Sequence, residues 1–168
     1  MSEPVIRPAV PSDLEALVRI NDAAAPAVPI TPLEELRALV ELSELALVVD
    51  DGTPAGFLLA MTPGRDYASE NYLWFSRRSA AFVYVDRIVL DPRLRGAGLG
   101  RGLYERVFAR GRELGAVEVT CEVNLQPPNP ASLAFHRRMG FTEVGRQWTK
   151  GASTEVALLA APLDLGRG

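Results

Sequence analysis

Four glycines fall within seven residues, at positions 96, 98, 100 and 102, in the run Asp-Pro-Arg-Leu-Arg-Gly-Ala-Gly-Leu-Gly-Arg-Gly. The run follows a strand-like segment and precedes leucines at helical spacing, so it predicts a strand end, a turn and a helix start. Small residues let the main chain approach a ligand, and the first N–H groups of a helix favour negative charge. Arg95 and Arg101 flank glycines and can donate charge-assisted hydrogen bonds. The turn therefore predicts a phosphate-binding site.

The spacing of the glycines indicates which kinds of phosphate ligand the turn is suited to bind. A dinucleotide fingerprint would need glycine at position 101 or 103, where the chain has Arg101 and Leu103. A P-loop needs Gly-Lys before Ser or Thr, and the only lysine is Lys150. The pattern present is Arg-x-x-Gly-x-Gly, beginning at Arg95. These failed motifs disfavour a nucleotide-phosphate binder of another class.

The chain has one cysteine, Cys121, and one histidine, His136. Together they are too few for a disulfide or a structural zinc site, and no metal is expected. A Cys–His nucleophile pair would use both residues. Strand alternation groups Cys121 with Val117, Val119 and Val123, which favours an inert buried thiol.

The elements that must position these residues alternate between strand and helix patterns. Ser12 with Glu15, and Thr31 with Glu34, are helix-start signatures. The segment 62–79 is expected to be irregular. Strands are predicted at 4–9, 45–49, 55–61, 81–90, 117–123, 141–146 and 154–161, and helices at 13–24, 32–42, 98–114 and 130–139.

These elements predict an α/β fold with a mixed, mostly antiparallel central sheet and helices on both of its faces. The strand–helix–strand unit at 81–123 should be a right-handed parallel crossover. Residues 1–168 are expected to form a single domain whose last few residues, after Leu163, are frayed.

The net charge of −3 conceals an uneven distribution. Residues 1–51 hold ten acids and three arginines, whereas residues 86–112 hold seven arginines and three acids. A basic stretch within an acidic protein favours a small anion over nucleic acid, although a solvated arginine-rich helix face explains it equally well. The longest apolar run, 156–161, is far shorter than the ~20 residues that span a bilayer. No membrane association and a cytoplasmic location are expected.

Two segments resemble a known family. VDRIVLDPRLRGAGLGRGLYERV, at 85–107, is similar to the acetyl-CoA-binding signature of the GNAT superfamily of acyl-CoA-dependent N-acyltransferases. NPASLAFHRRMGF, at 129–141, resembles the second signature of that family, and the similarity covers roughly residues 4–160. The resemblance implies direct transfer of an acetyl group from the co-substrate acetyl-CoA to a primary amine.

The resemblance also implies where coenzyme A binds. The pyrophosphate would lie on the glycine-rich turn, and the pantetheine arm would pair with main chain of the preceding strand. Asn124 and Asn129 match positions whose side chains often hold pantetheine, although turn and cap chemistry would also explain them. The implied binding residues are Ile88, Val89, Leu90, Arg95, Gly96, Ala97, Gly98, Leu99, Gly100, Arg101, Asn124 and Asn129.

The implied reaction needs a proton acceptor and a proton donor. A lysine-like amine, with a pKa of about 10.4, is protonated at pH 7 and must lose that proton before it attacks. Glu122 lies where relatives that acetylate protein N-termini carry the general base; Asp86 is the rival, and either acid could instead pair with Arg87. His136 occupies the position where the family usually has a tyrosine that protonates the departing thiolate.

The sequence leaves the acceptor open among a small amine, an amino acid, an antibiotic-like compound and a protein N-terminus. The acidic first third would favour a cationic acceptor. The resemblance makes a homodimer a candidate assembly. The alternative function is a regulatory module that binds acyl-CoA without turnover, because the Tyr-to-His difference puts the proton donor in question.

Overall fold

The computed structural model describes residues 3–164, and the predicted fraying after Leu163 falls on residues 165–168, which lie outside that range. The chain divides into two compact units, one of Met1–Met61 with Val85–Arg106 and one of Thr62–Tyr84 with Val107–Gly168. The hydrogen-bonded strand order is β1-β2-β3-β4-β5-β7-β6, and β4 (Phe82–Leu90) contributes to both units. The predicted mixed α/β sheet is therefore confirmed, whereas the single domain stays a prediction.

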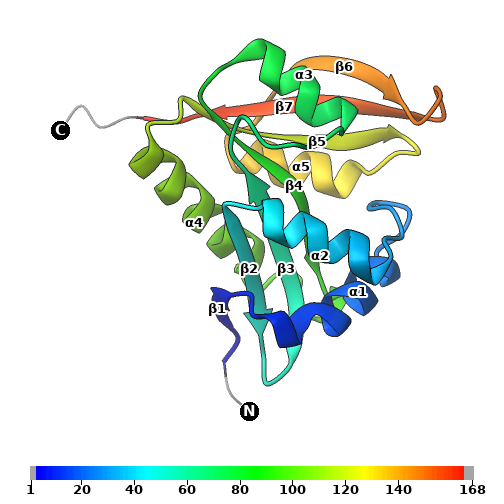
Figure 1. The fold of residues 1–168 in the computed structure, drawn as a ribbon, viewed down its shortest axis with the longest axis vertical. Helices are drawn as coiled ribbons and strands as arrows, with labels where there is room; N and C mark the ends of the chain where they lie inside the picture. The colour runs from blue at the N-terminus through cyan, green and yellow to red at the C-terminus, as the bar shows by residue number, and fades with distance from the viewer. Residues whose placement is uncertain (1–2, 165–168) are drawn as a thin grey trace. The chain divides into compact units, whose positions relative to one another are not determined.

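The first unit is built on antiparallel strands. Strand β1 (Val5–Pro8) pairs with β2 (Leu45–Asp50), and β2 pairs with β3 (Pro54–Met61). Helices α1 (Leu14–Ala23) and α2 (Leu33–Leu42) both contact β3, and Figure 1 shows them in blue and cyan. A short 3₁₀ turn, η2 (Pro92–Leu94), follows β4, and the first half of α4 (Leu99–Leu114) completes the unit.

Helix α1 shows how the sequence places a polar group inside this unit. Leu14, Leu17 and Asn21 recur at spacings of three and four residues, so they share one helix face. That face is buried, and Asn21 is 0% exposed. Burying each leucine stabilises the fold by about 1.5–3 kcal/mol, whereas the amide of Asn21 requires hydrogen-bond partners.

The second unit contains the parallel strand pair. Strand β5 (Glu118–Gln126) runs parallel to β4, with Val83 opposite Val119, and antiparallel to β7 (Thr154–Pro162). Strand β6 (Thr142–Thr149) pairs with β7, and α5 (Pro130–Arg138) contacts β5. The parallel pair confirms that the predicted connection joins parallel strands, whereas its right-handedness stays a prediction.

The expectation of an irregular segment at 62–79 is wrong, because residues 70–78 form helix α3 (Glu70–Arg78). The side chain of Ser69 caps the helix by accepting a hydrogen bond from the Tyr72 N–H. Tyr72 and Phe75, three residues apart, are buried. These two aromatic residues therefore form the buried face of a short helix.

Two predicted helix caps also differ in the structure. Ser12 lies within the 3₁₀ turn η1 (Pro11–Asp13), and Asp13 rather than Ser12 accepts the hydrogen bond of the Val10 N–H. Arg7 pairs with Asp13 at 2.8 Å and lowers the pKa of that carboxyl. Thr31 makes no cap for α2, whose N-cap residue is Pro32; the Thr31 hydroxyl instead donates to the carbonyl oxygen of Pro29 at 2.9 Å and accepts from Arg87 Nη1 at 3.1 Å.

Candidate active site

The predicted phosphate turn is an exposed loop held at both ends. The Asp91 N–H donates to the carbonyl oxygen of Ala55 on β3, and the Asp91 side chain accepts from the Arg93 N–H at 2.9 Å. Gly96 and Gly98 have φ values of 82° and 78°, in the left-handed region. A Cβ at either position would meet nothing within 4 Å. Glycine is needed there for backbone conformation and not for space.

Helix α4 begins directly after this turn. The Gly102 N–H donates to the carbonyl oxygen of Gly98, so the helical hydrogen bonds start at residue 98. The first N–H groups of a helix have no intrahelical acceptor, and the helix dipole adds positive character there. Arg95 and Arg101 are exposed beside the turn. The residues present therefore fit a phosphate group.

The strand before the turn is held closely to its neighbour. A Cβ on Gly56 of β3 would lie 2.8 Å from the carbonyl oxygen of Val89 and 2.7 Å from Leu90 Cδ2. Glycine at position 56 therefore allows β3 to approach Val89 and Leu90. Val89 is buried, whereas Ile88 and Leu90 are partly exposed. Sequence reasoning missed Gly56, because its partner strand begins more than twenty residues later.

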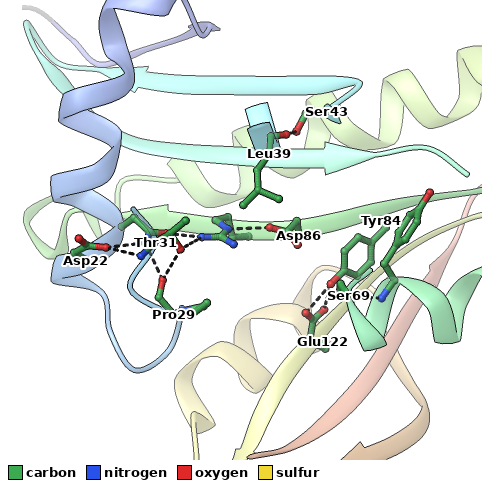
Figure 2. A network of polar contacts seen from close by, with 12 residues as sticks. Asp22, Pro29, Thr31, Leu39, Ser43, Ser69, Tyr84, Asp86 and Glu122 are labelled. Carbon is green, nitrogen blue, oxygen red and sulfur yellow. Dashed lines mark hydrogen bonds and ion pairs between the residues drawn. The ribbon is translucent and has the colours of Figure 1, made fainter. Parts of the chain in front are cut away.

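Asp86 forms the ion pair that the sequence left open as an alternative to a catalytic role. Its carboxylate accepts from Arg87 Nε at 2.8 Å, and the two side chains are 4% and 6% exposed. Arg87 Nη1 also donates to Asn21 Oδ1 at 2.9 Å and to Thr31 Oγ1 at 3.1 Å. Figure 2 shows this network around Thr31 and Asp86. Arg87 thus joins β4 to α1 and to the start of α2.

Glu122 has different surroundings. The Tyr84 hydroxyl lies 2.7 Å from Glu122 Oε1 and 2.9 Å from Oε2, as Figure 2 shows. Tyr84 is 0% exposed, whereas Glu122 is partly exposed. The sequence contains no local signal for this contact, because the register of β4 against β5 cannot be read locally.

His136 lies on the buried face of α5 at 3% exposure. Its Nδ1 is 2.7 Å from the carbonyl oxygen of Ser132, which can only accept a hydrogen bond. Nδ1 therefore carries the proton of the neutral ring, and Nε2 does not. Burial lowers the pKa of His136, while the bond to Ser132 opposes this more weakly.

The two asparagines occupy the end of β5 and the start of α5. Asn129 Oδ1 accepts from the Ser132 N–H at 3.4 Å, which is the cap that the sequence analysis gave as the alternative. The Asn129 N–H donates to the carbonyl oxygen of Asn124. Asn124 adjoins a register irregularity between β5 and β7. Cys121, on the same strand, is buried.

Within 3–164, no cluster of three or more His, Cys, Asp or Glu side chains could hold a metal ion. None of the helices in that range has the length and apolar character needed to cross a membrane.

The protein is therefore an α/β protein with a parallel strand pair in a mixed sheet, and it presents an exposed glycine turn at a helix start that fits a phosphate group. The Acetyltransferase (GNAT) family model matches residues 14–141. The chain belongs to this family.

Individual proteins show the same likeness. Peptidyl-lysine N-acetyltransferase YjaB of Escherichia coli (strain K12) is 35% identical over 63 residues, and the match spans 38% of each protein. The structure of Ard1 from Thermoplasma volcanium has a TM-score of 0.78 and 18% identity, covering 95% of this chain and 97% of that one. YncA from Salmonella typhimurium, with its cofactor acetyl-CoA, has a TM-score of 0.71 and 21% identity, covering 99% and 98%. Because the sequence identities are only 18% and 21%, these two structures establish the fold alone.

Proposed function

We propose that the protein transfers the acetyl group of acetyl-CoA directly to a primary amine. The observation that carries the proposal is the exposed turn at Gly96 and Gly98, which begins α4 within a chain of the acetyltransferase family. Acetyl-CoA supplies an acetyl group activated as a thioester. The family match at 14–141 includes residues of both compact units, which supports one acetyltransferase domain over the whole chain.

The proposed coenzyme A site uses main chain more than side chains. The backbone of 95–100, with Arg101, would hold the pyrophosphate, since helix-start donors favour anions. The N–H groups of Arg95 and Ala97 already donate to carbonyl oxygens of the turn, so we expect the other N–H groups of this segment to contribute most. Main chain at 88–90 would pair with the pantetheine arm. Asn124 and Asn129 would contact the same arm, although the side chain of Asn129 already caps α5.

Glu122 is the proposed general base. Glu122 is a partly exposed residue and its carboxylate accepts a hydrogen bond from the Tyr84 hydroxyl, so we expect it to take a proton from the acceptor ammonium directly or through water. Asp86 is the weaker candidate, because its carboxylate is buried and bonded to Arg87. Replacing Asp86 should disrupt the hydrogen bonds of Arg87 before it affects proton transfer.

His136 is the proposed proton donor to the departing thiolate. Its hydrogen bond to Ser132 limits when it can donate. The neutral ring holds its proton at Nδ1, toward Ser132. Donation from Nε2 requires a second proton, which burial disfavours. We expect donation by His136 to become effective only as the pH falls below neutrality.

The proposed acceptor is the amine of a peptide or of a small molecule. The name of the Escherichia coli relative specifies peptidyl lysine, which supports a primary amine. The excess of acids in residues 1–51 supports a cationic acceptor. We also propose that the protein is cytoplasmic and that it forms a homodimer.

The coenzyme A site can be tested with two matched glycines. Gly98 and Gly115 have φ values of 78° and 75°, and a Cβ would meet nothing within 4 Å at either. Alanine in the left-handed region costs about 1–2 kcal/mol, so Gly98→Ala and Gly115→Ala should lower the free energy of unfolding equally. Only Gly98→Ala should raise the Kd for acetyl-CoA, by about tenfold if the turn loses ~1.4 kcal/mol of binding. Calorimetry that gives the same Kd for both variants would remove the turn from the binding site.

A second candidate is a module that binds acyl-CoA without turnover. The observation that favours it is the buried His136, whose neutral form directs its proton to Ser132. Thiol release from acetyl-CoA with a panel of amines separates the candidates. Tight binding with no thiol release from any amine would favour the module.

A further inference from the structure

Tyr84 and Glu122 form a contact that the residue types alone did not suggest. The hydroxyl of Tyr84 is within hydrogen-bond distance of both carboxylate oxygens, at 2.7 and 2.9 Å. A phenol has one proton, so it donates to one oxygen at a time. The other oxygen retains lone pairs for a second donor.

The ring of Tyr84 is fixed by its neighbours. Its centroid lies 5.6 Å from that of Tyr72 and 6.0 Å from that of Phe75, and both of these residues belong to α3. Tyr72 is itself held, because its hydroxyl donates to the carbonyl oxygen of Thr62 at 2.7 Å. The backbone of Tyr84 lies opposite Thr120 in the parallel pair. The phenol is therefore a rigid donor and not a mobile surface group.

The register explains how the two side chains meet. Thr120 and Glu122 are two residues apart on β5, so they lie on one face of the strand. Tyr84 is opposite Thr120, and its long side chain reaches two positions along β5 to the carboxylate. A shorter side chain at position 84 would leave Glu122 without this contact.

We propose that Tyr84 is a positioning residue that holds the carboxylate of Glu122 in the orientation in which it accepts the proton of the acceptor amine. This inference rests on the proposed function, in which Glu122 is the general base. A carboxylate that lacks the Tyr84 hydrogen bond would be less restricted in orientation and would present its basic oxygen to the amine for a smaller fraction of the time. Orientation of this kind affects kcat, whereas substrate binding need not change.

The test compares Tyr84→Phe with Tyr72→Phe, which removes another buried hydroxyl from the same aromatic cluster. Tyr84→Phe should lower kcat about tenfold, a fraction of the 10²–10⁴-fold contribution of a general base, with little change in the KM for acetyl-CoA. The acid limb of the kcat/KM profile should move to higher pH, because the charged carboxylate loses a donor. Tyr72→Phe should lower the unfolding temperature without moving that limb.

Other titratable groups are the same in the proteins compared. His136, Glu118 and Arg78, on β5 or on helices that contact it, are present in every variant, so the difference between profiles reports the lost hydroxyl. If Tyr84→Phe does not fold, 3-fluorotyrosine at position 84 retains the shape and strengthens the donor. That replacement should move the acid limb to lower pH.

Glu122→Gln distinguishes the failure of this inference from the failure of the proposed base. A Glu122→Gln variant that retains full kcat would overturn the assignment of the base. If Glu122→Gln is inactive while Tyr84→Phe keeps the wild-type kcat and acid limb, only the role of Tyr84 is overturned. If 3-fluorotyrosine at position 84 leaves the acid limb unchanged, the role of Tyr84 is also overturned.

Discussion

The two acidic residues on the paired strands β4 and β5 have opposite kinds of partner. Asp86 is bonded to the guanidinium of Arg87, which also binds Asn21 and Thr31. Glu122 is bonded to the neutral hydroxyl of Tyr84. The contact of Asp86 pairs its negative charge with a cation, whereas the contact between Tyr84 and Glu122 is a hydrogen bond from a hydroxyl group. Residue type and strand position made both acids candidates, and their partners favour a structural role for Asp86 and the proposed catalytic role for Glu122.

Breaking the Asp86–Arg87 pair should produce the largest effect on stability. Arg87→Met leaves a carboxylate buried without its cation, and removal of one partner of a buried ion pair costs about 3–5 kcal/mol. The doubly substituted protein, with Asp86→Leu and Arg87→Met, should recover part of this loss, although Asn21 still loses a donor. Urea unfolding measures the free energy of unfolding of both variants. A loss below about 1 kcal/mol for Arg87→Met would contradict the structural reading of Asp86.

The complementary experiment replaces Glu122, the proposed general base. Glu122→Gln should lower kcat by about 10²-fold or more while leaving the free energy of unfolding nearly unchanged, because Glu122 is partly exposed. Asp86→Asn is the matched control, an acid-to-amide change that should destabilise the protein and leave kcat within about threefold. Thiol release and urea unfolding are measured on both variants. The reverse pattern would make Asp86 the base.

The same comparison shows what could be predicted from the sequence. The glycine turn is local, since strand pattern, glycines and helix pattern follow one another within residues 81–114, and its position was predicted correctly. Helix α3 was missed because its stability comes from burying Tyr72 and Phe75 beside Tyr84, which is a tertiary effect.

The partners of the two acids required the register of segments far apart in the chain. Arg87 meets Asn21 across 66 residues, and Tyr84 meets Glu122 across 38. The sequence placed Arg87 beside Asp86, so it offered the ion pair as an alternative. It contained no local signal for Tyr84, because a parallel pairing can slide by two residues without changing which side chains share a face.

His136 extends the comparison to a buried group that is hydrogen-bonded to a backbone carbonyl oxygen. Its Nδ1 is bonded to the carbonyl oxygen of Ser132, and burial lowers its pKa below the ordinary value near 6.5. Between the two pKa values the unfolded chain binds more protons than the native protein, so the free energy of unfolding increases with pH. The stabilisation from a neutral His136 is therefore complete above about pH 6.5 and is lost as the pH falls below that value.

His136→Phe isolates this smaller effect, because His136 is the only histidine in the chain. The variant loses the bond to Ser132 and should be less stable at pH 7.5. Its free energy of unfolding should decrease less than that of the wild type between pH 6.5 and 5, since the carboxylates titrate alike in both proteins. Urea unfolding at several pH values measures the difference. Parallel curves would mean that the buried ring accepts its second proton as easily as the unfolded chain does, and imidazolium would then be available as a proton donor near neutral pH.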